Sequence, residues 1–151
     1  MSSMTRYTLL TLILFTGCTK QIDPDKVADS ITKGLAEKKL TVKVSCPSGR
    51  PAKAGDKFAC TGTDDAKTPI TVNVTQKDDK GTVEWKLDGQ ILDVETVVAD
   101  AKGKLTGADI ACARKAVIVK PHDTYECEIK GAPQKKLTIK VDGDNVAWEA
   151  N

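Results

Sequence analysis

The sequence predicts an α+β protein made of two tandem units, each with one helix packed on a four-stranded antiparallel sheet and one disulfide per unit. Two observations lead to this prediction. An aromatic residue lies two positions before a cysteine twice, in Phe58-Ala59-Cys60 and in Tyr125-Glu126-Cys127, and aligning these motifs brings much of the chain into register. In each copy, apolar residues recur first at helical spacing and then at alternate positions. We expect the units at residues 23–88 and 91–151.

Matched residues extend through most of both copies. Cys46 matches Cys112, and Asp56 matches Asp123. The other matches join apolar strand positions: Ile70, Val72 and Val74 with Leu137, Ile139 and Val141, then Val83 and Trp85 with Val146 and Trp148. The tryptophans match once four residues are removed from the turn before Val83, because the corresponding turn before Val146 is four residues shorter. The sequence therefore predicts two similar units that join near residues 89–90.

A helix is expected at the start of each unit. Asp23 precedes Pro24, an order that is favoured at the N-cap and first position of a helix. Asp93 begins the second helix in the same way. The apolar residues that follow share one helical face: Val27, Ile31 and Leu35 in the first copy, and Val94, Val97, Val98, Ala101 and Leu105 in the second. Each helix is therefore expected to pack one face on a sheet.

After each helix, the apolar residues alternate with polar ones, as they do in antiparallel sheets with one face in water. The composition of residues 79–81 and 142–145 predicts hairpin turns. Trp85 and Trp148 occupy equivalent inward positions, where packing in a core is favoured over stacking on a ligand.

Residues 1–17 have the pattern of a secretory signal peptide. Arg6 is followed by a short apolar run over residues 9–15, and then by the small residues Thr16 and Gly17. That run is much shorter than the roughly 20 apolar residues that a membrane-spanning helix needs. We therefore expect an exported protein.

The residues that end this segment resemble the bacterial lipobox. The segment Phe15-Thr16-Gly17-Cys18 carries the resemblance, which implies cleavage before Cys18 and attachment of lipid to it. Several acyl chains give stable membrane anchoring. Residues 18–22 are then expected to form the lipidated anchor and a short linker. Thr19 after the cysteine favours the outer membrane, if the host has one.

The four cysteines after Cys18 are an even number in an exported protein, which predicts disulfides. Four cysteines allow three pairings. The links Cys46–Cys60 and Cys112–Cys127 are favoured, because each would close a short loop within one small unit that needs such a constraint. A zinc site is disfavoured, since the chain has no C-x-x-C motif and one histidine.

These motifs resemble the domain of unknown function family DUF4333, whose members occur in bacterial envelope lipoproteins. The resemblance rests on Val44-Ser45-Cys46-Pro47 and on the segment from Gly55 to Cys60, with a more divergent copy at residues 110–112 and 125–127. The tandem architecture is also similar to that of the beta-lactamase inhibitory protein. Because fold likeness does not confer function, this second resemblance implies architecture alone.

Composition and motifs exclude several classes of function. The chain has 23 Lys and Arg and 21 Asp and Glu, so no basic excess points to a nucleic-acid partner. No nucleophile, base and metal ligands converge, so we expect no enzyme, no metal and no cofactor. His122, the single histidine, is interpreted as a surface loop residue. The acidic groups Asp64-Asp65, Asp78-Asp79 and residues 142–145 are interpreted as solvated turns.

Val117, Ile118 and Val119 interrupt the similarity of the two copies, because the matching loop at residues 49–53 is small and polar. Three apolar residues there could extend a strand, pack against the other copy or form an exposed patch, and exposed patches mark contacts. Our hypothesis is that they form the principal partner surface.

The sequence thus predicts a non-catalytic, lipid-anchored cell-envelope lipoprotein that acts as a binding or structural module for a protein or envelope component. The alternative is a protein inhibitor, or a periplasmic or outer-membrane assembly factor, that uses the surface where the two sheets meet.

Overall fold

A computed structural model describes residues 20–132 and 135–151. The predicted signal peptide at residues 1–17 and the predicted lipid attachment site Cys18 lie outside these ranges. The first helix, α1, spans Pro24–Ala36, and the second, α2, spans Val94–Lys104. The strands are β1 (Val42–Ser45), β2 (Lys57–Asp64), β3 (Pro69–Gln76), β4 (Val83–Leu87), β5 (Gln90–Asp93), β6 (Asp109–Ala111), β7 (Ala116–Val119), β8 (Thr124–Lys130), β9 (Lys136–Asp142) and β10 (Asn145–Ala150).

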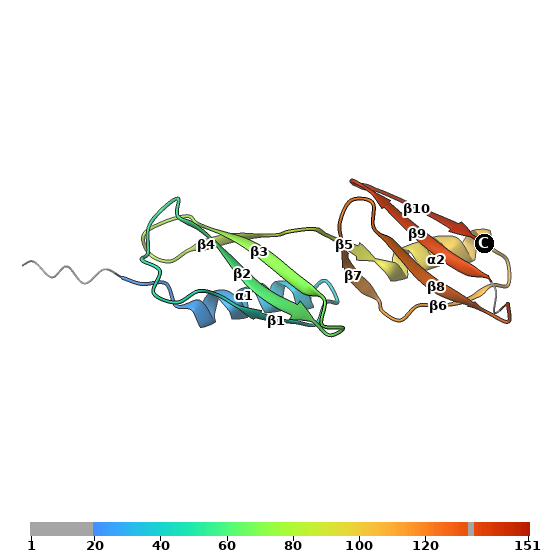
Figure 1. Cartoon of the computed structure of the whole chain (residues 1–151), viewed down its shortest axis with the longest axis horizontal. Coiled ribbons are helices and arrows are strands. Elements are labelled where there is room, and N and C mark those ends of the chain that lie inside the picture. The colour runs from blue at the N-terminus through green and yellow to red at the C-terminus, as the bar shows by residue number, and fades with distance from the viewer. Residues whose placement is uncertain (1–19, 133–134) are drawn as a thin grey trace, which may run out of the picture.

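The described strands form three antiparallel sheets. The first has the order β1-β2-β3-β4, the second has the order β10-β9-β8-β6, and β5 pairs with β7 in a sheet of two strands. Figure 1 shows the first sheet with α1 and the second sheet with α2 following each other along the long axis of the molecule, with β5 and β7 between them. The predicted α+β class is confirmed.

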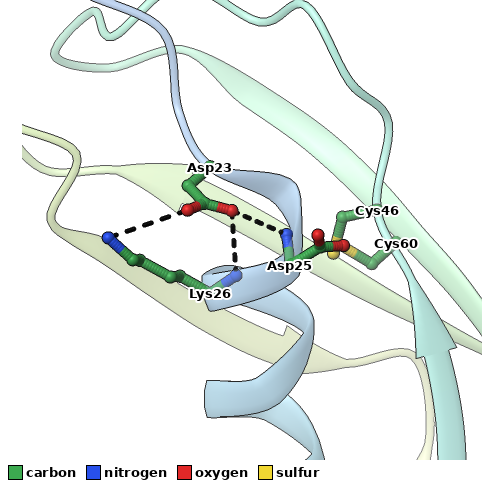
Figure 2. Close-up of a disulfide and its surroundings, with 5 residues drawn as sticks. All are labelled: Asp23, Asp25, Lys26, Cys46 and Cys60. Atoms are coloured by element: carbon green, nitrogen blue, oxygen red, sulfur yellow. Dashed lines mark hydrogen bonds and ion pairs between the residues drawn. A yellow bond between two sulfur atoms is a disulfide. The ribbon is translucent and has the colours of Figure 1, made fainter.

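Both helices begin as their sequences predict. The Asp23 carboxylate accepts hydrogen bonds from the backbone N–H groups of Asp25 and Lys26, and Asp93 accepts one from Thr96 (Figure 2 shows Asp23). These contacts satisfy N–H groups that lack partners within the helix. Helix α1 then buries Val27, Ile31 and Leu35 completely or almost so. The polar caps therefore fix where each helix starts, and the apolar face fixes its orientation.

Two apolar cores fill the space between helices and sheets. The first joins α1 to the inward residues of β1–β4, and the second joins α2 to those of β6–β10. Trp85 packs on the first core, where its ring covers Gly34 of α1 so closely that a Cβ there would lie 2.6 Å from the ring. Trp148 packs on the second core, and its Nε1 donates a hydrogen bond to Asp100 at 2.8 Å.

The strand register corrects one detail of the alignment between copies. Cys60 lies opposite Val72, and Cys127 lies opposite Leu137, so Val72 rather than Ile70 corresponds to Leu137. Trp85 and Trp148 still correspond, because they lie opposite Val74 and Ile139. The segment from Cys127 to Trp148 is therefore shorter than the segment from Cys60 to Trp85 in two hairpins instead of one. A shift of two residues keeps every side chain on its face of the sheet, so side-chain alternation cannot reveal it.

Candidate functional site

Both expected disulfides are present. Cys46 is bonded to Cys60 and Cys112 to Cys127, with Cα atoms 4.3 and 4.5 Å apart. Each joins the residue after an edge strand to the neighbouring strand, as Figure 2 shows for the first bond. Cys60 and Cys127 are almost completely buried. The cysteines therefore have a structural environment, and each bond holds the loop that connects two strands.

The loop of the first disulfide is organised by polar contacts around Gln76, a residue that the sequence analysis did not single out. Its side chain is 1% exposed. Its Oε1 accepts a hydrogen bond from the Lys53 N–H at 2.7 Å, and its Nε2 donates to the Pro51 carbonyl and the Asp56 carboxylate. Arg50 donates to the same carboxylate at 2.6 Å. The position of Gln76, two residues after Val74 in an alternating strand, is the signal that would have placed it inward.

The predicted partner surface at residues 117–119, in the loop of the second disulfide, is wrong. Val117 and Val119 are 5% and 4% exposed and belong to the second core, and Ile118 is partly buried against the first core. All three lie in β7, which pairs with Gln90–Asp93. The apolar run therefore forms a buried strand, because β5 offers it both backbone partners and an apolar surface. It does not provide an exposed surface for a partner.

The most buried charged contact among the described residues connects the two sheets. The Asp64 carboxylate at the end of β2 accepts a hydrogen bond from the Arg114 guanidinium at 2.6 Å. The two side chains are 3% and 19% exposed. Asp64 also accepts backbone hydrogen bonds from Ala66 and Thr68. The sequence predicted that Asp64 and Asp65 form a solvated turn. This prediction is wrong for Asp64, which is buried, whereas Asp65 is exposed.

The surroundings of this pair favour its charged form. Burial by itself raises the pKa of Asp64, but hydrogen bonds from Arg114 and Thr68 outweigh that effect and bring the pKa below its ordinary value. The hydrogen bond with Asp64 raises the pKa of Arg114. A carboxylate that loses most of its hydration needs such partners. The pair is therefore a fully charged link between β2 and the loop before β7.

Further contacts surround this link at the junction of the two sheets. Lys39, after α1, donates a hydrogen bond to Glu95 at 2.6 Å and lies 3.7 Å from Asp93, both at the start of α2. Ala116 belongs to the first core, and Ile91 and Ile118 pack against it. The strands β5 and β7 thus contact both halves of the molecule. The junction combines apolar packing with ion pairs at its rim.

The connection between the sheets leaves no room for a side chain at Gly89. Its φ is +133°, a value that favours glycine. A Cβ at this position would lie 3.0 Å from the Val119 carbonyl oxygen and 3.2 Å from Ile118. With Asp88, this glycine is the connection between β4 and β5. The chain therefore passes from one sheet to the other by a close turn.

Two open hollows flank this turn. One is about 600 Å³ and is lined by Leu87, Gly89 and Ile91 with the charged residues Lys38, Lys39 and Asp93 around them, among others. The other is about 550 Å³ and lies towards Pro121 and the turn of β9 and β10. Lys86 lines both. Each is a mixed polar and apolar depression, and neither brings together a nucleophile and a base.

His122 lies in an exposed turn, with its Nδ1 atom 3.5 Å from the exposed Asp142 carboxylate. Its φ is +72°, and Gly55, the residue matched to it, has a φ of +79°. Both residues therefore have the left-handed backbone conformation, which glycine adopts more readily than histidine. Within residues 20–132 and 135–151, no group of three or more His, Cys, Asp or Glu side chains is placed to hold a metal ion. In the same ranges, no helix has the length and apolar character to cross a membrane.

Comparison with known proteins extends this description. The family model of the domain of unknown function DUF4333 matches residues 8–81. Over that segment, the chain is similar to the DUF4333 family. The match covers α1 through the turn after β3 and includes Cys18, whereas residues 82–151 lie outside it. No curated protein and no solved structure gives a significant match to the chain. The expected likeness to the beta-lactamase inhibitory protein thus has no support from these comparisons.

Proposed function

We propose that this protein is a non-catalytic lipoprotein of the cell envelope, anchored through Cys18, that acts as a binding or structural module. In this proposal, residues 23–88 and 91–151 are two copies of one helix-and-sheet unit. The first copy sits at the membrane, and the second is held at a fixed distance from it.

Two pairs of contacts and a common strand order support the relation between the copies. Before α1, Ile22 donates its N–H to the Arg50 carbonyl at 2.9 Å, which is the same pairing that β5 makes with β7 before α2. The Lys20 side chain donates to the Lys80 carbonyl in the hairpin between β3 and β4. The Gln90 side chain likewise donates to the Gly143 carbonyl in the hairpin between β9 and β10. The two four-stranded sheets also have the same order of strands relative to their disulfides.

The anchor is supported by the sequence and by the short separation of Cys18 from α1. The residues before Cys18 have the pattern of a signal peptide, and the family match includes Cys18. Residues 18–22 separate that cysteine from Asp23, the N-cap of α1. Five extended residues reach at most about 18 Å. A lipid on Cys18 therefore keeps the first unit close to the bilayer.

The observation that carries the proposal is the locked junction. The buried pair of Asp64 and Arg114 and the apolar contacts of β5 and β7 hold the second unit against the first. A flexible linker would let the second unit fold back or drift, whereas this junction fixes its direction. Such an arrangement suits a module that presents a surface away from its anchor.

Cys18→Ser tests the anchor. We expect the wild-type protein to incorporate labelled palmitate and to fractionate with membranes, and the variant to lose the label and to appear in the soluble fraction or as an uncleaved precursor. The matched control is Thr19→Ser, which changes the neighbouring residue and leaves the acceptor intact. A Cys18→Ser protein that is processed and retained on membranes as the wild type is would contradict the proposal.

The hollows at the junction favour a second candidate, a protein inhibitor or an assembly factor that binds where the sheets meet. Lys86 is exposed and lines both hollows. A partner that binds there should protect Lys86 from chemical acetylation and leave Lys43, which is exposed on the strand β1, accessible.

A further inference from the structure

A third hollow lies at the end of the molecule that the anchor would hold. It is about 430 Å³ in volume and lies between the start of α1, the segment before it and the hairpin that joins β3 to β4. Ile22, Val27 and Val83 give it an apolar lining. Lys20, Lys26 and Lys80 provide its positive charge, and Lys20 donates to the Lys80 carbonyl at 2.9 Å.

The acidic groups near this hollow are occupied by other donors. Asp23 is the one carboxylate in the lining, and it accepts the two N–H groups at the start of α1, as Figure 2 shows. Lys26 lies 3.7 Å from Asp23 and is 83% exposed, so this ion pair is weak. In the hairpin, Asp78 accepts hydrogen bonds from Lys80 and Thr82, and Asp79 accepts one from the Ala54 N–H. The lining thus holds three lysines and one carboxylate, and this excess of positive charge can attract an anion.

The same position in the second unit carries no such charge. Where the first unit has Lys20, the second has Gln90, which makes the corresponding hydrogen bond to its hairpin. Counting from the N-caps Asp23 and Asp93, Lys26 corresponds to Thr96. The hairpin of the second unit, residues 142–145, contains two aspartates and no lysine. The positive hollow is thus a property of the unit next to Cys18, and the fold alone does not require it.

We propose that this hollow binds the phosphate of an anionic lipid headgroup in the membrane that holds Cys18. This inference rests on the proposed lipid anchor, because Lys20 lies two residues after Cys18 and the anchor brings the hollow to the headgroups. A lipid chain alone fixes position but leaves rotation free. Lysines that contact headgroups add a second attachment, which orients the first unit and, through the junction, the second.

Vesicle binding tests the proposal with an unlipidated protein, the chain from residue 18 onward carrying Cys18→Ser. We expect it to sediment with vesicles that contain phosphatidylglycerol and to remain soluble with vesicles of phosphatidylcholine alone. Because a lysine near an anionic surface strengthens binding about fivefold, replacing Lys20, Lys26 and Lys80 by Gln should weaken binding roughly 100-fold. Circular dichroism of the triple variant verifies that it remains folded.

The matched control replaces Lys57, Lys102 and Lys135 by Gln. These lysines are exposed, and none makes an ion pair within the described residues. We expect the control to keep binding within about threefold of the parent. Equal loss in both variants would overturn the proposal in favour of general charge attraction, and no binding to anionic vesicles would overturn it directly.

A further arm separates a headgroup from free phosphate. Soluble glycerol phosphate and inorganic phosphate are added at matched ionic strength. Displacement from vesicles by inorganic phosphate at low concentration would assign the hollow to free phosphate and overturn the lipid ligand, whereas retention on the vesicles supports it. Because the test protein has no lipid, its result is independent of the Cys18 experiment on the native chain.

Discussion

At the scale of single residues, the Asp64 carboxylate connects the turn after β2 to the loop before β7. Its backbone partners, Ala66 and Thr68, close the turn after β2, and its side-chain partner, Arg114, comes from the other half of the chain. A buried carboxylate without these donors would lose several kcal/mol of hydration that nothing replaces. The link is therefore favourable only while all three contacts exist together.

Asp64→Asn should destabilise the protein by about 3 kcal/mol, because it leaves Arg114 partly buried without its counter-charge. We expect the midpoint of thermal unfolding to fall by roughly 6–12 °C. Asp65→Asn is the matched control, since its carboxylate is 59% exposed and lies 3.5 Å from the same guanidinium. Equal midpoints for Asp64→Asn and the wild type would contradict the assignment of this pair as the link.

The pH dependence of this contribution follows from the direction of the shift. The pKa of Asp64 is lower in the folded protein than its ordinary value of 3.8. The contribution is therefore complete above about pH 4–5, decreases as the pH falls below the ordinary value, and is lost once the pH passes the lower folded-state pKa. The difference in unfolding midpoint between wild type and Asp64→Asn should shrink over that acidic range.

Single residues also show what sequence could and could not provide. The cysteine pairs were predictable, because each closes a short loop between cysteines 14 or 15 residues apart. The role of Asp64 was not, since its partner is 50 residues away and a pair of aspartates before a turn is usually solvated. Arg114 lies in a disulfide loop with no periodic pattern, so nothing local marks it as buried.

At the scale of elements, β7 differs in structure from the loop at residues 49–53, although the sequence alignment matches the two segments. The loop at residues 49–53 makes an isolated bridge between Gln21 and Pro51, whereas β5 and β7 pair over four residues each. The first loop is held by polar contacts of Gln76 and Arg50. The second is held by apolar burial of Val117 and Val119.

The same comparison explains why the sequence suggested a partner surface. The valines departed from a polar loop in the aligned copy, and a single sequence gives no sign that the segment before α2 pairs with them. The strand β5 is also short, and it begins three residues after the end of β4. Long-range strand pairing decides burial here, and it leaves no local signal.

Replacing both Val117 and Val119 by Ser should lower the free energy of unfolding by about 4–6 kcal/mol, because each change removes buried methyl groups and places a hydroxyl in the core. Denaturant unfolding measures this loss. Val146→Ser is the control, since Val146 is 44% exposed and should change stability by less than about 0.5 kcal/mol. A loss of unfolding free energy below about 0.5 kcal/mol in the double variant would contradict the burial of these valines and favour the exposed surface that the sequence suggested.

At the scale of the whole molecule, the two sheets and their helices lie one after the other, with the C-terminus at the end away from the first sheet (Figure 1). The junction between them is built from a close glycine turn, the paired strands β5 and β7, and the buried pair of Asp64 and Arg114. Each of these restricts a different motion: bending at the connection, separation of the cores, and rotation of one sheet against the other.

The halves should therefore move as one body at neutral pH. Spin labels on cysteines introduced at Lys57 and Glu126, exposed positions on β2 and β8, report the distance between the sheets while the native disulfides remain intact. We expect one narrow distance distribution.

In Asp64→Asn the distribution should broaden, because only the apolar contacts and the rim ion pairs remain. The wild-type distribution should broaden once the pH falls to the lowered pKa of Asp64, below its ordinary value of 3.8, since protonation of Asp64 removes the same link. Asp65→Asn should keep the narrow distribution at neutral pH. A broad distribution in the neutral wild-type protein would show that the junction is flexible, and a module that fixes the direction of its second half would no longer fit this chain.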